Sequence, residues 1–147
     1  TALITNGSGG PAISLNSSKP GVFAFNTIVG NLASPVINCV SAANILASIV
    51  AKNTPATAQF SGSCTLKDVV VGSMDNTTGT NVIKMDPAFM TNQGTSQLTL
   101  ANGEACCVDK IDSGNADAAL KAVTRDFFGR ARLSGTKYDI GYHEYTP

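Results

Sequence analysis

The sequence predicts an all-β protein: a right-handed parallel β-helix with coils of ~22 residues, a short helix and a C-terminal capping segment. Three observations lead to this fold class. Apolar, β-branched segments recur at a constant spacing, Gly, Ser, Thr and Asn are abundant, and no amphipathic stretch of helical length occurs before residue 115. Short strands and turns with a period of roughly 20 to 30 residues are typical of a β-solenoid, whose stacked coils bury a continuous apolar column.

A comparison of the chain with itself reveals the repeat. Three ten-residue blocks share one pattern, an apolar run closed by a polar residue, and follow at intervals of 22: residues 22–31, 44–53 and 66–75. The closing residues are Asn31, Asn53 and Asp75. Asn tolerates left-handed backbone geometry, and its amide can bond to an equivalent Asn, so we expect Asn31 and Asn53 to form a ladder. A second, looser set of strands comprises 11–15, 35–39 and 56–61.

Both sides of the repeated strands are apolar. Alternation predicts one face with Phe23, Phe25, Ile45, Ile49, Val69 and Val71, and an opposite face with Ile28, Leu46, Val50 and Val70. Runs that are apolar on both sides are normally buried on both sides, so a cover is expected over the outer face. The C-terminal segment, an N-terminal part or another chain could provide it, and ordinary exposed aliphatic side chains are the alternative.

The chain reads as one domain, 1–147, in which residues 1–110 form the coils and residues 111–147 form the helix and the cap. Alanine-rich residues 115–125 predict the helix, with Asn115 available as its N-cap. Aromatic residues gather after it and are expected to close the last coil rather than to form a sugar platform: Phe127, Phe128, Tyr138, Tyr142 and Tyr145.

The N-terminal residues already read as a coil, with strands expected at 2–4 and 12–15. A first coil without a cap would expose unpaired N–H and C=O groups over an open apolar core. We therefore expect this edge to stack on a further coil, either from a longer parent protein of which this chain is the end, or from another copy through self-association.

Composition narrows the classes of partner. The formal net charge is zero and only 14% of residues are charged, so no basic field exists for nucleic acid. No apolar run reaches the roughly 18 to 20 residues that a membrane-spanning helix needs, so no membrane span is expected.

The cysteines are disulfide candidates. Cys39, Cys64, Cys106 and Cys107 lack the paired CxxC spacing of a zinc site. An oxidising compartment is favoured over the alternative of four reduced core thiols. Cys39 and Cys64 lie near strand ends on successive coils and are predicted to bridge, which leaves Cys106 and Cys107 as a vicinal pair or as free thiols.

Several motifs towards the C-terminus resemble the closing region of bacterial surface β-helix proteins of the choice-of-anchor Q type. The matching residues are Asp86-Pro-Ala-Phe89, Leu98, Leu100, Cys106-Cys-Val-Asp109, Asp126, Gly129, Arg132 and the terminal Asp139-Ile-Gly-Tyr-His-Glu-Tyr145. The resemblance implies the pectin-lyase-like superfamily and an exported, extracellular or cell-surface bacterial protein. The chain departs from the pattern in two ways: Cys106-Cys107 stands where the family has Ser-Pro, and no anchoring segment follows Tyr145.

Few residues in the coils could do acid–base chemistry. The acids are Asp68, Asp75 and Asp86. Asp75 aligns with the Asn ladder and Asp86 belongs to the Asp-Pro motif, so only Asp68 lacks a structural role. Paired carboxylates across a glycosidic bond, as glycosidases require, are therefore not evident.

The single histidine, His143, lies beside Glu144 and near Asp139. Two ligands on one short strand do not make a metal site, so we predict no catalytic, cofactor-binding or metal-ligating residue. We expect instead that Arg130 or Arg132 pairs with Asp139 or Glu144 at the surface and fastens the terminal strand.

These features favour a non-catalytic extracellular structural or adhesive module, in a surface or fibrous assembly, with polysaccharide or other surface proteins as partners. No enzymatic activity is expected from these residues. The alternative is a polysaccharide-binding or polysaccharide-cleaving β-helix, a lyase or hydrolase, whose active residues lie upstream of this chain. Turnover of acidic glycans by the chain that vanishes on Asp68→Ala would overturn the first reading.

Overall fold

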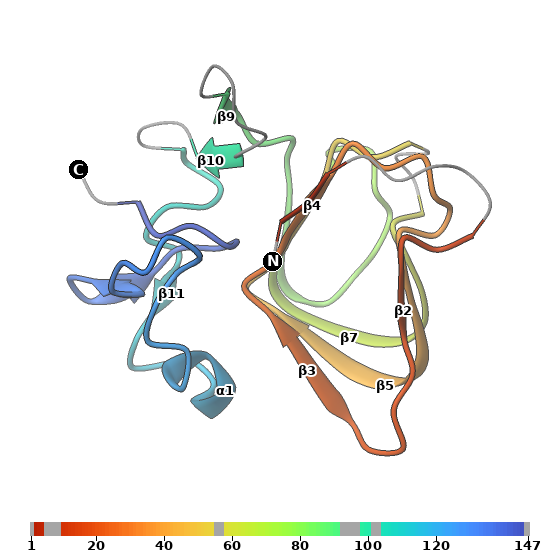
Figure 1. Cartoon of the computed structure of the whole chain (residues 1–147), viewed down its shortest axis with the longest axis horizontal. Coiled ribbons are helices and arrows are strands. Elements are labelled where there is room, and N and C mark those ends of the chain that lie inside the picture. Colours follow the sequence, from red (N-terminus) through yellow and green to blue (C-terminus); the bar gives the residue numbers. More distant parts are fainter. Residues whose placement is uncertain (1, 5–9, 55–57, 92–97, 101–103, 146–147) are drawn as a thin grey trace.

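The computed structural model describes residues 2–4, 10–54, 58–91, 98–100 and 104–145. These residues are mostly strand, and their only helix is the single turn α1 (Ala118–Lys121). The all-β class is therefore confirmed. Figure 1 shows a curled parallel sheet beside a C-terminal segment with shorter strands.

Eight strands form the curled sheet: β1 (Ala2–Ile4), β2 (Ile13–Leu15), β3 (Gly21–Ala24), β4 (Thr27–Val29), β5 (Ile37–Leu46), β6 (Ile49–Val50), β7 (Phe60–Val71) and β8 (Thr80–Lys84). Successive passes of the chain pair in parallel. Strands β2 and β3 pair with β5, β5 pairs with β7, and β7 pairs with β8. Strand β1 pairs with β4 in the same way. The strands expected at 2–4 and 12–15 are thus present. The further coil that we expect to stack on this N-terminal edge stays a prediction.

The repeat holds for two blocks and shifts at the third. Ile45 pairs with Phe23, 22 residues earlier, but with Leu66, 21 residues later. The predicted spacing of 22 for the third block is therefore wrong by one residue. The next pass is much shorter, because Val69 pairs with Val82 only 13 residues on.

The Asn ladder predicted between passes is confirmed. Asn31 donates from its backbone N–H and its Nδ2 to Asn53 Oδ1, at 2.9 and 3.0 Å. The ladder continues through Gln59, whose Oε1 accepts from Asn53 Nδ2 at 2.8 Å and whose N–H donates to Asp75 Oδ2. Asp75 therefore joins the ladder through Gln59, because the one-residue shift removes it from direct register.

Left-handed residues turn the chain at equivalent corners of each pass. Phe25, Ala47 and Asp68 have φ values of 54°, 45° and 55°, and Asn81 follows with 52°. The second corner uses Gly30 and Lys52, one residue before the ladder asparagines, so the Asn residues themselves do not supply the left-handed geometry. A left-handed residue between two strands resets which parity faces inward.

This reset corrects the predicted faces. The cluster enclosed by the curled sheet contains Phe23, Ile28, Ile45, Val50, Val69 and Val71. Phe25, Leu46, Ile49 and Val70 belong instead to a second cluster outside it. Strict alternation wrongly groups Phe25 and Ile49 with Phe23 and Ile45, because it ignores the corner residues. For the same reason it wrongly groups Ile28 and Val50 with Leu46 and Val70.

The C-terminal segment covers the outer cluster. Tyr138 and Ile140 pack there with the helix residue Leu120 and with both Cys106 and Cys107. Gly141 donates its N–H to the carbonyl of Ala47, and Tyr142 donates to Thr27 Oγ1 on an earlier pass. The sequence analysis named three possible covers for the outer face, and the C-terminal segment is the one that the structure shows. The segment lies along the side of the sheet rather than over the end of the stack, so the expected cap is misplaced.

The C-terminal strands are short and antiparallel. Strand β9 (Phe89–Thr91) pairs with β10 (Leu98–Leu100), while β13 (Lys137–Tyr138) pairs with β11 (Ile111–Asp112) and β12 (Leu133–Ser134). The helix predicted over 115–125 with Asn115 as N-cap is wrong in extent. Its N-cap is Asp117, whose carboxylate makes an ion pair with Lys67 instead of capping the helix.

Candidate functional site

Two disulfides lie in the two apolar clusters. Cys39 joins Cys64 between the second and third passes, the pairing that the strand positions predict. Cys106 joins its neighbour Cys107, and both side chains are buried beneath the C-terminal segment. Disulfides persist in oxidising compartments, so the pair of bonds favours a location outside the cytoplasm.

The coil acids all have structural partners. Asp68 occupies a left-handed corner, is 8% exposed, and accepts from Asn81 Nδ2 at 2.7 Å on the next pass. Asp75 receives the N–H groups of Gln59 and Thr77. Asp86 accepts the hydroxyl of Ser73 at 2.6 Å, and this bond lowers its pKa. Asp68 therefore has the structural role that the sequence did not reveal.

The terminal motif forms a buried network around Asp139. Its carboxylate accepts the N–H groups of Asp109 and Tyr145, while its own N–H donates to Glu144 Oε2. Burial nevertheless raises the pKa of Asp139, because the two N–H donors only partly offset the loss of solvent.

The predicted arginine pair is Arg132 with Glu144, at 3.7 Å between Nη1 and Oε2. It is buried rather than exposed, since the side chains are 2% and 1% accessible. The guanidinium lies 3.9 Å above the ring of Phe25, and burial lowers its pKa against the opposing effect of Glu144. Nε and Nη1 have no hydrogen-bond partner within the described ranges, and the guanidinium contacts the Phe25 ring and the charge of Glu144.

His143 is buried next to Arg130, with 3.0 Å between Nε2 and Nη1. Burial, followed by the charge of Arg130, lowers the pKa of His143. A neutral ring can accept a hydrogen bond from Arg130 Nη1 through Nε2. The geometry thus gives His143 a fastening role, and groups of three or more His, Cys, Asp or Glu that could hold a metal ion do not occur among the described residues.

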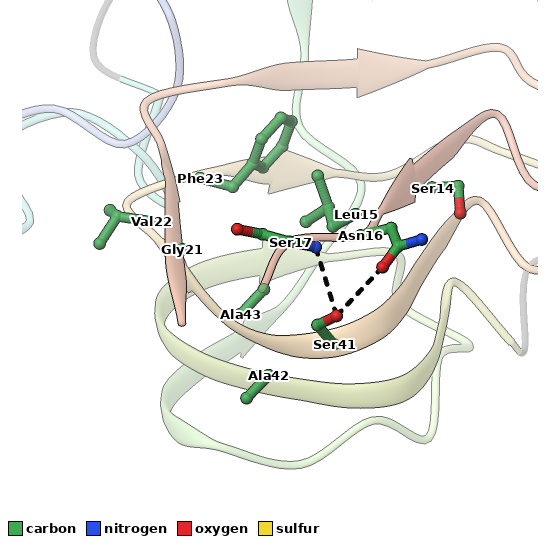
Figure 2. A pocket seen from close by; sticks show the side chains of 10 residues that line it. All are labelled: Ser14, Leu15, Asn16, Ser17, Gly21, Val22, Phe23, Ser41, Ala42 and Ala43. Carbon is green, nitrogen blue, oxygen red and sulfur yellow. Dashed lines mark hydrogen bonds between the residues drawn. The ribbon is translucent and has the colours of Figure 1, made fainter. Parts of the chain in front are cut away.

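A groove of about 240 Å³ lies at the corner between β2, β3 and β5 (Figure 2). The segment at this corner shortens from pass to pass: it contains residues 16–20 between β2 and β3, residues 40–42 within β5, and only Ser63 within β7. The segment of the first pass therefore projects furthest. Ser41 donates its hydroxyl to Asn16 Oδ1 and accepts the N–H of Ser17, each at 3.2 Å, and the apolar side chains of Leu15 and Phe23 also line the groove. The lining of the groove is entirely uncharged, so it offers no acid or base.

A second surface is the loop 125–131, which the sequence assigned to capping. Phe127 lies on it and is 60% exposed. Beside Phe127, the carboxylate of Asp126 accepts the N–H groups of Phe128 and Arg130 within the loop. The sequence marks Asp126 only as part of a family motif. Asp126, Gly129 and Arg130 could have predicted a tight turn here, because Asp and Gly favour such turns.

The site and fold together define an all-β, disulfide-containing protein with a curled parallel sheet. Comparison with protein-family models, with curated proteins and with solved structures gave no match. Within the residues described, a helix long and apolar enough to cross a membrane is not found.

Proposed function

We propose that this chain is a non-catalytic structural or adhesive module of an exported bacterial surface protein, built as a right-handed parallel β-helix related to the choice-of-anchor Q type. The parallel, nearly in-register passes and the recurring left-handed corners support the β-helix. The disulfides support export.

One observation carries the functional part of this proposal. The ionisable side chains that could have served as acid or base are engaged in holding the fold: Asp68 bonds to Asn81, His143 contacts Arg130, and Glu144 pairs with Arg132. A catalytic acid or base must also lie within hydrogen-bond reach of its substrate, whereas these three side chains are buried. A scaffold fastened in this way is suited to display a surface.

The test is incubation of the chain with pectic and other acidic glycans, with release of sugar fragments as the readout. We expect no turnover by the wild-type chain. Turnover that disappears in Asp68→Ala would overturn the proposal, and the exposed-site variant Asp112→Ala serves as the control for a general effect of removing an acid.

A further inference from the structure

The two disulfides differ in what they can do for stability. A disulfide stabilises a fold largely because it closes a loop in the unfolded chain, and the effect grows with the length of that loop. Cys39 and Cys64 are 25 residues apart, so their bond closes a substantial loop. Cys106 and Cys107 are adjacent, so their bond closes none. Restriction of the unfolded chain therefore does not account for the second bond.

The turn that carries Cys106 and Cys107 also holds the C-terminal segment. The carbonyl of Cys107 accepts the N–H of Ile140 at 2.8 Å, and Asp109 donates its N–H to Asp139 Oδ1 at 2.7 Å. Both cysteines are buried, at 1% and 0% exposure, in the same outer cluster as Ile140. A change at the disulfide therefore acts directly on the attachment of the segment.

Reduction would enlarge this buried pair. Bonded sulfurs lie about 2 Å apart, whereas non-bonded heavy atoms keep roughly 3.5 to 4 Å between them. A close-packed core accepts added volume poorly, because the neighbouring side chains must leave their preferred positions. Two thiols in place of the Cys106–Cys107 bond therefore press on the side chains packed around them, and Ile140 of the terminal segment is one of these.

The reduced form also has a partner of its own. Glu104 Oε1 lies 3.7 Å from Cys106 Sγ, and the Glu104 carbonyl accepts the N–H of Cys107 at 3.1 Å, which keeps this acid beside the pair. A disulfide sulfur has no hydrogen to donate, whereas a thiol can donate to the carboxylate. The turn thus suits two states, one closed by the S–S bond and one with a thiol beside a carboxylate.

We propose that Cys106–Cys107 is a redox-sensitive clasp, and that its reduction by a small dithiol loosens the C-terminal segment from the side of the sheet. One thiol of the reductant attacks a sulfur of the pair and forms a mixed disulfide, which the second thiol resolves. The Cys106–Cys107 bond breaks, the two sulfurs of the reductant become a disulfide, and one hydrogen passes to each cysteine. This inference goes beyond the adhesive function and does not depend on it.

The same segment controls access to the clasp. Because both cysteines are almost fully buried, a dithiol reaches their sulfurs only when the segment lifts, so the rate of reduction reports on that opening. Gly141 is where the segment approaches the sheet most closely, since a Cβ there would lie 2.8 Å from Ile49 and Thr27. Gly141→Ala should therefore speed the reduction of Cys106–Cys107.

The test is treatment of the oxidised chain with dithiothreitol, with alkylation and mass mapping of an aliquot to identify which bond has opened. Hydrogen exchange of the Ile140 and Gly141 amides then measures how firmly the segment is attached. We expect exchange at these amides to rise at least about tenfold on reduction of the clasp, to return on reoxidation, and to stay unchanged at Ile45 of β5. A variant with Cys39→Ala and Cys64→Ala should keep this response.

The matched control is a variant with Cys106→Ala and Cys107→Ala, in which dithiothreitol should not alter exchange of the terminal segment. Gly135→Ala, whose added Cβ meets open space, should leave the rate of reduction as in the wild type. Equal exchange in the oxidised and reduced wild type would overturn the clasp, as would an undiminished response in the control variant. Equal rates of reduction in Gly141→Ala and Gly135→Ala would overturn the claim that the segment guards the bond.

Discussion

Replacing Glu144 with Gln tests how the C-terminal segment is attached to the sheet. The substitution keeps an oxygen that can accept the N–H of Asp139, so the main loss is the negative charge beside Arg132. Arg132 then stays buried against Phe25 with its strongest opposing charge removed.

The expected cost follows from burial. The two side chains are 2% and 1% accessible, and removal of one partner from a buried ion pair costs about 3 to 5 kcal/mol. We expect the lower end, about 3 kcal/mol, because Asp126 and Asp139 still act on the guanidinium. For a domain of this size, that loss lowers the melting temperature by roughly 6 to 12 °C.

The assay is urea unfolding of the oxidised protein, with Asp117→Asn as the matched control. Asp117 pairs with Lys67 in the same interface, but the Lys67 and Asp117 side chains are 36% and 40% accessible, so Asp117→Asn should lower the free energy of unfolding much less than Glu144→Gln does. The double variant Arg132→Met/Glu144→Leu should regain much of the stability, since apolar residues can replace a buried pair. Equal, small effects of Glu144→Gln and Asp117→Asn would refute this account of the attachment.

Three further predictions concern the same fold. The folded-state pKa of His143 lies below its unfolded value of about 6.5, so the unfolded chain binds the proton first as the pH falls. The stabilising effect of the neutral His143 ring is therefore present above about pH 6.5 and declines as the pH falls below that value. Unfolding free energies from pH 8 to 5.5 should therefore fall less steeply in His143→Gln, and parallel profiles would count against burial of the neutral ring. Replacing Cys39 and Cys64 with Ala should cost about 3 kcal/mol in chemical unfolding, as expected for a bond that spans 25 residues, and an unchanged midpoint would speak against this pairing. Gly141→Ala should cost about 2 kcal/mol or more, because its φ is 104° and a Cβ would lie 2.8 Å from Ile49 and Thr27. Gly135→Ala, with φ 78° and open space around it, should cost less in thermal unfolding, and equal losses would show that the contact with the sheet is unimportant.

Much of the sheet was predictable because its determinants are local and repeated. Like residues recur at like positions in each pass, so aligning the chain with itself is enough to predict the strands and the Asn31–Asn53 ladder. The pairing of Cys39 with Cys64 follows from the same alignment, since both residues lie at matching places on neighbouring passes.

The candidate site was less predictable, because it depends on contacts between distant segments. Arg132, which pairs with Glu144, is buried against Phe25, a residue more than a hundred positions away in the chain. The conformation of the loop that presents Phe127 likewise involves the carboxylate of Asp126, which accepts three N–H groups, one of them from Glu144. Composition indicated an aromatic cluster but could not tell a covered ring from an open one.

The sequence by itself therefore determined the strand class, the repeat and the positions of its polar ladder, because these are properties of periodic side chains. Only the tertiary structure decided which parity faces inward, since a left-handed residue such as Phe25, Ala47 or Asp68 reverses the alternation at a corner. It also decided that the C-terminal segment covers the side of the sheet. The apolar side chains left outside by those corners require a cover there, and that requirement exists only after the chain has folded into its passes.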